Sequence, residues 1–150
     1  MSLSVRPAES KDLPFIYQLI IEFSIFQKTP EKVKITLEQM LKDQMDFKCL
    51  VAIESNEILG FSSFYFAYHS WTGKAIYLDD LYVRPAYRGQ KIGDLLFEAV
   101  KNIGIEKNCV KMKWMVSDWN TNAQEYYKRK GATIESSEWV CDLELIKRPN

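Results

Sequence analysis

A short stretch of basic residues and glycines, residues 83–93, has the composition of an anion-binding loop. It contains Arg88 and Lys91 beside Gly89 and Gly93, and it joins a strand-like apolar run to a run with helical periodicity. The first N–H groups of a helix have no partner inside the helix, so together with the helix dipole they favour a bound anion. Gly89 would let the backbone approach a phosphate, and Gly93 would let the helix pack near the strand. A solvated basic loop is the simpler alternative, and these residues alone do not exclude it.

Two pairs of adjacent residues, one of aspartates and one of tyrosines, carry groups that could transfer protons. Asp79 and Asp80 interrupt an apolar run that predicts a strand, where carboxylates are unusual. In a regular strand they would face opposite sides, which would leave at least one of them solvated. Tyr126 and Tyr127 are adjacent in a predicted helix, so they point in different directions and at most one can face a given site. Packing of either ring on the helix face is the alternative, and spacing does not choose between them.

The elements that must position these residues follow a mixed α/β order. Apolar residues recur at helical spacing in some segments and form alternating or continuous runs in others. The predicted helices are residues 9–26, 36–45, 92–103 and 120–130, and the predicted strands are residues 4–6, 48–54, 57–68, 75–83, 110–117 and 139–146. The three middle strands predict an antiparallel meander. A helix then connects residues 75–83 to residues 110–117, which predicts that these two strands run parallel.

Composition narrows the class of protein. The 150 residues fit one domain, which we expect to span residues 1–150. Twenty basic residues balance twenty acidic ones, without the basic excess of most nucleic-acid-binding domains. No apolar run approaches the roughly 20 residues that span a bilayer, and charges interrupt the N-terminus where a signal peptide would be apolar. Three widely spaced cysteines and the single histidine, His69, predict no metal site. We expect a cytoplasmic, metal-free enzyme with neither nucleic acid nor membrane as a partner.

The anion-binding loop resembles a known signature. Residues 88–93 are similar to the coenzyme A signature of the GNAT superfamily of N-acetyltransferases, Arg/Gln-x-x-Gly-x-Gly/Ala. Arg88 and Gly93 match its ends, whereas Lys91 replaces its central glycine but still offers a backbone N–H group. Further blocks, in the same order, resemble the spermidine/spermine and thialysine N-acetyltransferases over residues 6–145. These are Trp71-x-Gly-Lys, Tyr77-Leu-Asp-Asp-Leu-Tyr-Val, Asp118-Trp-Asn, Tyr126-Tyr-Lys-Arg-Lys-Gly-Ala and Ser136-Ser-Glu-Trp.

The resemblance implies a fold, a donor and an assembly. The fold would be a GNAT-like mixed sheet, mainly antiparallel with flanking helices, and splayed between the third meander strand and the parallel strand that follows it. The donor would be acetyl-CoA, and the assembly a homodimer. Asn120 matches a coenzyme-contacting position, although it could equally cap the predicted helix. The coenzyme-binding residues implied in this way are Leu81, Val83, Arg88, Gly89, Gln90, Lys91, Ile92, Gly93, Asn120 and Tyr127.

The resemblance also assigns roles in catalysis. Amine acetylation needs a deprotonated amine and a proton for the departing thiolate, and alkyl amines titrate near the lysine reference of about 10.4. Tyr127 matches the family's general acid, and Asp79 matches a carboxylate that draws the amine's proton through water. Asp80 matches a residue that binds the cationic substrate. The superfamily has a bulge in this strand, which would break the alternation of side chains and direct a backbone N–H toward the acetyl carbonyl.

Three residues match the lining of the polyamine channel in the resembled enzymes, namely Trp71, Glu138 and Trp139. Tryptophan faces attract ammonium groups and carboxylates hold them. A core or dimer contact is the alternative for either tryptophan. His69 stands where the polyamine enzymes have an acidic residue, which leaves diamines, thialysine-like amines and other small amines open as acceptors.

The predicted function is transfer of an acetyl group from acetyl-CoA to a primary amine of a small cationic acceptor, such as a diamine, a polyamine or a thialysine-like amine. Acetylation of a protein lysine or N-terminus is one alternative, and it would need an open groove. A non-catalytic acyl-CoA-binding module is another, although the presence of Tyr127 and Asp79 argues against it.

Overall fold

The computed structural model describes residues 2–146, and the chain divides after Trp114 into two compact units. The expectation of a single domain stays a prediction. The elements are β1 (Ser4–Pro7), η1 (Ser10–Asp12), α1 (Leu13–Phe26), η2 (Pro30–Lys32), α2 (Leu37–Lys42), β2 (Lys48–Glu54), β3 (Glu57–His69), β4 (Gly73–Val83), η3 (Pro85–Tyr87), α3 (Ile92–Glu106), β5 (Lys111–Lys113) and α4 (Thr121–Arg129).

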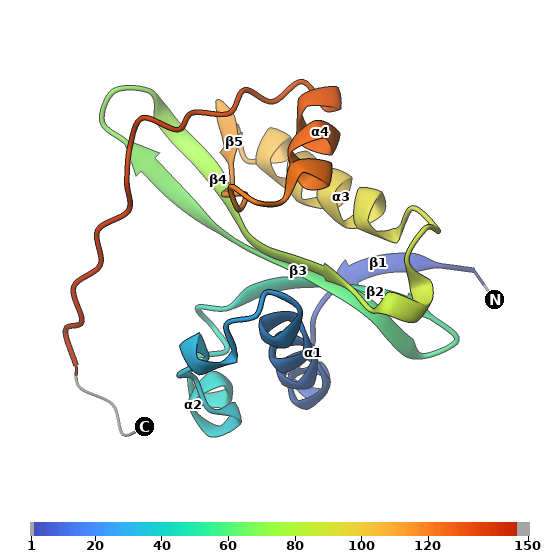
Figure 1. Cartoon of the computed structure of the whole chain (residues 1–150). Coiled ribbons are helices and arrows are strands. Elements are labelled where there is room, and N and C mark those ends of the chain that lie inside the picture. Colours follow the sequence, from blue (N-terminus) through green and yellow to red (C-terminus); the bar gives the residue numbers. More distant parts are fainter. Residues whose placement is uncertain (1, 147–150) are drawn as a thin grey trace. The chain divides into compact units, whose positions relative to one another are not determined.

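One five-stranded sheet organises the first unit, with the strands in the order β1-β2-β3-β4-β5 (Figure 1). The pairs from β1 to β4 are antiparallel, and β4 pairs with β5 in parallel. The turn between β2 and β3 uses Ser55 and Asn56, both with positive φ, as a tight two-residue hairpin requires. The predicted meander and parallel crossover are therefore confirmed, and with them the mixed, mainly antiparallel sheet.

The parallel pair is short, and this produces the expected splay. The register joins Ala75, Ile76 and Tyr77 of β4 to β5, whereas β4 continues to Val83. Within the described residues, no strand pairs with this side of β4 after Tyr77. The predicted strand at residues 110–117 is therefore too long, because only the part that lies beside β4 forms a ladder.

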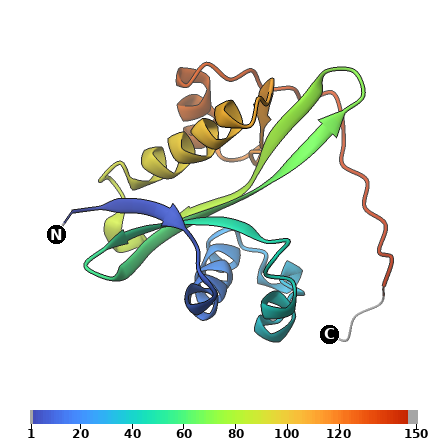
Figure 2. The same ribbon diagram turned by 180° about the vertical axis from the view of Figure 1, so that it is seen from behind.

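Helices cover both faces of the sheet in this unit, as the two opposite views show (Figures 1 and 2). Helices α1 and α2 lie on one face and α3 lies on the other. Pro14 stands in the first turn of α1, and the Thr36 side chain accepts a hydrogen bond from the Gln39 N–H at the start of α2. Both helices begin as their sequence signals predict, but within narrower bounds than expected.

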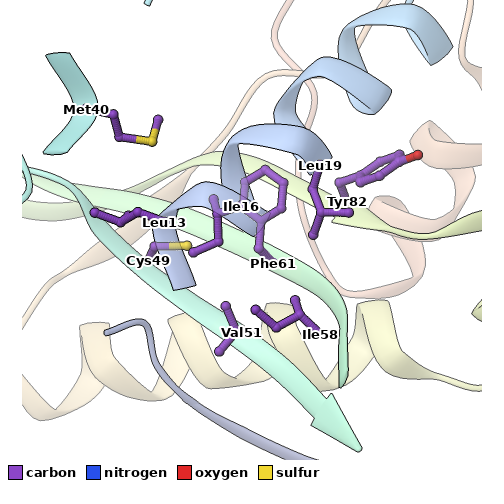
Figure 3. Packing of buried hydrophobic residues seen from close by; sticks show 9 residues of the cluster. All are labelled: Leu13, Ile16, Leu19, Met40, Cys49, Val51, Ile58, Phe61 and Tyr82. Carbon is purple, nitrogen blue, oxygen red and sulfur yellow. The ribbon is translucent and has the colours of Figure 1, made fainter. Parts of the chain in front are cut away.

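The core beneath α1 fixes the orientation of three strands. Figure 3 shows side chains of α1 meeting those of β2, β3 and β4. Phe61 of β3 is fully buried there, and Val51 and Tyr82 are its Cα partners on either side. Opposed residues of an antiparallel ladder share a face, so this row identifies the α1 face of the sheet. The buried members of the cluster are Leu13, Ile16, Leu19, Met40, Cys49, Val51, Ile58, Phe61 and Tyr82.

The predicted final strand at residues 139–146 is wrong. These residues are irregular in the structure, as is the whole stretch after Gly131. Its apolar side chains are exposed, among them Trp139, Val140 and Leu143. An apolar pattern shows that a segment suits a strand, but a strand also needs a ladder partner. Within residues 132–146 the structure records no such pairing.

Candidate active site

The centre of β4 contains a β-bulge. The ladder between β3 and β4 pairs Phe64 with Leu78 and Ser63 with Asp80, so the register shifts and Asp79 is left without a Cα partner. A bulge places two residues of one strand opposite one residue of its neighbour and leaves the extra residue unpaired. The predicted bulge is confirmed at the acidic pair, and it removes the strict alternation that would have pointed the two carboxylates to opposite faces.

Asp80 lies on the α1 face of the sheet, because it is two residues from Tyr82 and pairs with Ser63, two residues from Phe61. Burial, followed by the nearby charge of Asp79, raises the pKa of Asp80 from 3.8 to about 6. Asp79 remains partly exposed to solvent, yet the protein around it excludes enough water to raise its pKa as well. The structure therefore brings the two carboxylates together in a partly desolvated place.

Two stacked tyrosines accompany this acidic pair. Tyr65 and Tyr77 face each other across β3 and β4, with ring centroids 4.8 Å apart and an interplanar angle of 17°. Burial, followed by neighbouring charge that includes Asp79, raises the pKa of both phenols. Carboxylates beside electron-rich rings form a suitable environment for an ammonium group. Residue types alone do not predict this stacked pair, because only the strand register brings Tyr65 and Tyr77 together.

The loop between β4 and α3 has the backbone expected of an anion site. Gly89 has φ +82°, and a Cβ at this position would meet nothing within 4 Å, so the backbone is open to a ligand. Lys91 immediately precedes α3 and is also left-handed, with φ 63° and ψ 19°. The amides that open α3 at Ile92 and Gly93 lack a carbonyl partner in a preceding turn. A Cβ on Gly93 would touch Leu81 and Val83 at ordinary distances of 3.6 and 3.7 Å.

Arg88 supports this loop from within. Its Nε donates a hydrogen bond of 3.0 Å to the Val83 carbonyl, and its guanidinium lies over the rings of Phe26, at 4.7 Å, and Tyr82, at 5.6 Å. Neighbouring Arg84 is similarly held, by an ion pair of 3.0 Å with Glu57. The positive charge that the sequence suggested for phosphate binding is thus partly used to fix the loop to β4 and α1.

The second unit contains the predicted tyrosine and asparagine. Asn120 accepts a hydrogen bond of 3.2 Å from the Ala123 N–H, so the helix-cap interpretation is confirmed. Tyr126 and Tyr127 contact each other edge to face, with centroids 5.4 Å apart. Lys130 lies over the Tyr126 ring, whereas burial raises the pKa of Tyr127. Tyr127 is therefore protonated at neutral pH, as a general acid must be.

The residues predicted to line an acceptor channel are on the surface. Trp71 is 97% exposed in the turn between β3 and β4, and Trp139 is 92% exposed in the irregular segment that also contains Glu138. Neither tryptophan belongs to a core in this structure. The predicted site residues are divided between the two units: Trp71, Asp79, Asp80 and the loop lie in the first, and Asn120, Tyr127, Glu138 and Trp139 lie in the second.

Comparison with known proteins identifies the family. Residues 13–132 match the acetyltransferase (GNAT) family. The chain belongs to this family. It is 34% identical over 151 residues to the thialysine N-epsilon-acetyltransferase of Bos taurus, a match that covers 91% of this chain and 89% of the relative. It is also 34% identical over 145 residues to the spermidine/spermine N(1)-acetyltransferase-like protein 1 of Homo sapiens, covering 89% of this chain and 21% of that longer protein.

Solved structures agree with the GNAT fold. An aminoglycoside N-acetyltransferase in complex with CoA superimposes with a TM-score of 0.73 at 18% identity, covering 95% of this chain and 94% of that one. The GNAT family and its named acetyltransferase relatives show that this chain is an enzyme, an acetyl-CoA-dependent N-acetyltransferase.

The backbone conformation of Lys91 shows how this chain departs from the GNAT signature. Lys91 occupies the place of the signature's central glycine, and the structure gives it the left-handed conformation that glycine adopts without steric cost. The replacement keeps the backbone path of the loop and its N–H group at the expense of local strain.

Among residues 2–146, the structure contains no group of three or more His, Cys, Asp or Glu residues arranged to hold a metal ion. No helix in this part of the chain combines the length and the apolar character needed to cross a membrane.

Proposed function

We propose that this enzyme transfers the acetyl group of acetyl-CoA to a primary amine of a small cationic acceptor, namely a diamine, a polyamine or a thialysine-like amine. The observation that carries the proposal is the acidic pair at the bulge of β4, partly desolvated and beside the stacked rings of Tyr65 and Tyr77. A buried carboxylate near a second one is costly unless a cation neutralises it. The names of the thialysine and spermidine/spermine relatives support the same class of acceptor.

The residues around the start of α3 fit the coenzyme. The first amides of α3, at Ile92 and Gly93, and the open backbone at Gly89 suit a pyrophosphate. Leu81 and Val83 lie in the part of β4 that continues past its pairing with β5. The Val83 carbonyl accepts a hydrogen bond from Arg88, so the Leu81 main chain and the Val83 N–H are proposed to serve the amides of the pantetheine arm. Acetyl-CoA supplies an activated acetyl thioester there. The proposed coenzyme-binding residues are Leu81, Val83, Arg88, Gly89, Gln90, Lys91, Ile92, Gly93, Asn120 and Tyr127.

The proposed mechanism is direct attack by the amine. The acceptor's ammonium group loses a proton to Asp79 through water, and the raised pKa of this carboxyl makes it a better proton acceptor than an ordinary aspartate. The amine nitrogen then forms a bond to the acetyl carbon while the carbon–sulfur bond breaks. The Tyr127 phenol donates its proton to the departing thiolate, and it regains a proton when the newly acetylated nitrogen loses its second proton through water. Asp80 holds the positive charge of the acceptor, and Trp71, Glu138 and Trp139 are proposed to contribute to acceptor binding.

The test is an acetylation assay over polyamines, diamines, thialysine, lysine, aminoglycosides and short peptides, performed with wild type and Asp80→Asn. We expect acetylation of small di- or polycationic amines, with a raised KM in the variant. Acetylation confined to peptides would replace this proposal with protein acetylation. Coenzyme binding without transfer to any amine would indicate a non-catalytic acyl-CoA-binding module. A cytoplasmic location, expected from the composition, and a homodimer, implied by the resemblance, remain predictions.

A further inference from the structure

Three polar side chains form a row across the middle of the sheet. Cys49 of β2 pairs with Ser63 of β3, and Ser63 pairs with Asp80 of β4. Directly opposed residues place their side chains on the same face, and Cys49 belongs to the core beneath α1. Burial raises the pKa of the Cys49 thiol, and the negative charges of Asp12 and then Asp80 contribute to the rise, which agrees with this arrangement. The row runs from the buried Cys49 to the half-buried Asp80.

Ser63 is the unexplained member of the row. It is 3% exposed, and its Oγ has no hydrogen-bond partner among the described protein atoms. The thiol of Cys49 is directed to the carbonyl of Leu50, at 3.6 Å, and does not serve the hydroxyl. Leaving a buried hydroxyl without a partner costs about 1–3 kcal/mol. A methyl group would fill this position without that cost, and the row places this hydroxyl beside Asp80, where a bound ligand can supply the missing donor.

The neighbouring Asp80 indicates what the partner is. An ammonium group has three N–H donors, so the Asp80 carboxylate alone leaves room for a further acceptor. The Ser63 oxygen can accept another, on the same face and directly across the ladder. The pair of Ser63 and Asp80 lies beside the bulge, whereas Asp79, the proposed base, is the bulged residue itself. A diamine has two cationic ends, so one can react near Asp79 while the other is held by Asp80 and Ser63.

We propose that Ser63 is an acceptor-positioning residue, whose hydroxyl accepts a hydrogen bond from the second, non-reacting ammonium group of the acceptor. This rests on the proposed function and deepens it, because it makes the enzyme selective for acceptors with a second amine over monoamines of the same length. The burial of Ser63 reinforces the selectivity, since the alkyl chain of a monoamine leaves both Asp80 and Ser63 without a donor.

The test compares Ser63→Ala with Ser62→Ala. Ser62 is an adjacent serine, 0% exposed and equally without a partner for its Oγ. It pairs with Leu50 and Leu81, so it faces the other side of the sheet. The acceptors are 1,4-diaminobutane, 1,3-diaminopropane and the matched monoamines butylamine and propylamine. For Ser63→Ala we expect the KM of the diamines to rise about 5- to 10-fold, with kcat, monoamine KM and acetyl-CoA affinity changing less than about 2-fold.

One further variant, together with the Ser62→Ala control, makes the result decisive. Ser63→Thr keeps a hydroxyl and should recover most of the diamine affinity, whereas Ser62→Ala should leave the preference for diamines unchanged. If Ser63→Ala alters stability but leaves the ratio of diamine to monoamine KM as in wild type, Ser63 holds only a structural water and the inference is wrong. In that case diamine acetylation sensitive to Asp80→Asn would still support the proposed function. Wild-type enzyme that acetylates no diamine would overturn both.

Discussion

Asp80 should destabilise the protein at neutral pH, and replacing it should make the fold more stable. The fold raises the pKa of this carboxyl from 3.8 to about 6, chiefly through burial. A pKa that is higher in the folded state means that the folded protein binds the proton more tightly, so stability falls as pH rises between these two values. At about 1.4 kcal/mol per pH unit, the full penalty above pH 6 is at most about 3 kcal/mol.

The size of this penalty is best measured from the pH dependence of the stability difference between Asp80→Asn and wild type. The variant cannot ionise at this position, so its advantage over wild type should be about 3 kcal/mol at pH 7.5 and about 1 kcal/mol at pH 4.5. An asparagine amide brings its own cost of burial, on the order of 1 kcal/mol, but that cost is the same at both pH values. The difference of about 2 kcal/mol between the two conditions therefore isolates the ionisation of Asp80.

Urea denaturation followed by tryptophan fluorescence provides the assay. For a domain of this size, a difference of about 2 kcal/mol corresponds to a shift of roughly 1 M in the urea midpoint. Glu31→Gln, at an exposed carboxylate in η2, is the control and should move the midpoint little at either pH. A gap between Asp80→Asn and wild type that does not change with pH would refute the claim that the fold desolvates this carboxyl. The same variant should lose affinity for cationic acceptors, because a neutral amide attracts them less than a carboxylate does.

Four other substitutions test the remaining assignments. Tyr127→Phe should lower kcat about 100-fold or more with little change in acetyl-CoA affinity measured by calorimetry; an unchanged rate would remove Tyr127 from the mechanism. Arg88→Ala removes the bond to the Val83 carbonyl and two ring contacts, so coenzyme affinity should fall about 5- to 10-fold, and unaltered affinity would contradict the role of the loop. Lys91→Gly relieves a left-handed residue at about 1–2 kcal/mol, partly offset by the entropy of glycine; the urea midpoint should rise slightly, and a clear fall would argue against this strain. Gly60→Ala would place a Cβ 2.6 Å from the Tyr82 carbonyl oxygen and should cost about 1–3 kcal/mol; a thermal midpoint like that of wild type would contradict this packing.

The sequence predicted most elements of the first unit because their signals are local. The positive-φ turn at Ser55 and Asn56 and the cap at Thr36 each act within a few residues. The strand at residues 139–146 failed for the opposite reason, since a ladder partner is a non-local condition. The shortening of β5 to Lys111–Lys113 has the same cause.

The acidic pair of Asp79 and Asp80 shows what the sequence could predict and what it could not. Two carboxylates inside an apolar run were unusual in the sequence, and the resemblance to the GNAT superfamily predicted the bulge. The stack of Tyr65 on Tyr77 and the row formed by Cys49, Ser63 and Asp80 depend on how three strands align. A shift of one residue in that register would send these side chains to the opposite face, so residue types alone could not predict them.

The same register explains why an enzyme would keep an unfavourable group in its sheet. A carboxyl with a pKa near 6 and a buried hydroxyl without a partner among the described protein atoms both weaken the free protein, and the proposed ammonium group would relieve both. The destabilisation of the unliganded protein would thus favour diamines over monoamines. An acceptor that lacks the second cation relieves neither group. The two costs and the selectivity should therefore disappear together. Ser63→Ala combined with Asp80→Asn should give a protein at least as stable as wild type at neutral pH that no longer prefers diamines to monoamines. Retention of the preference in that double variant would show that selectivity is determined elsewhere.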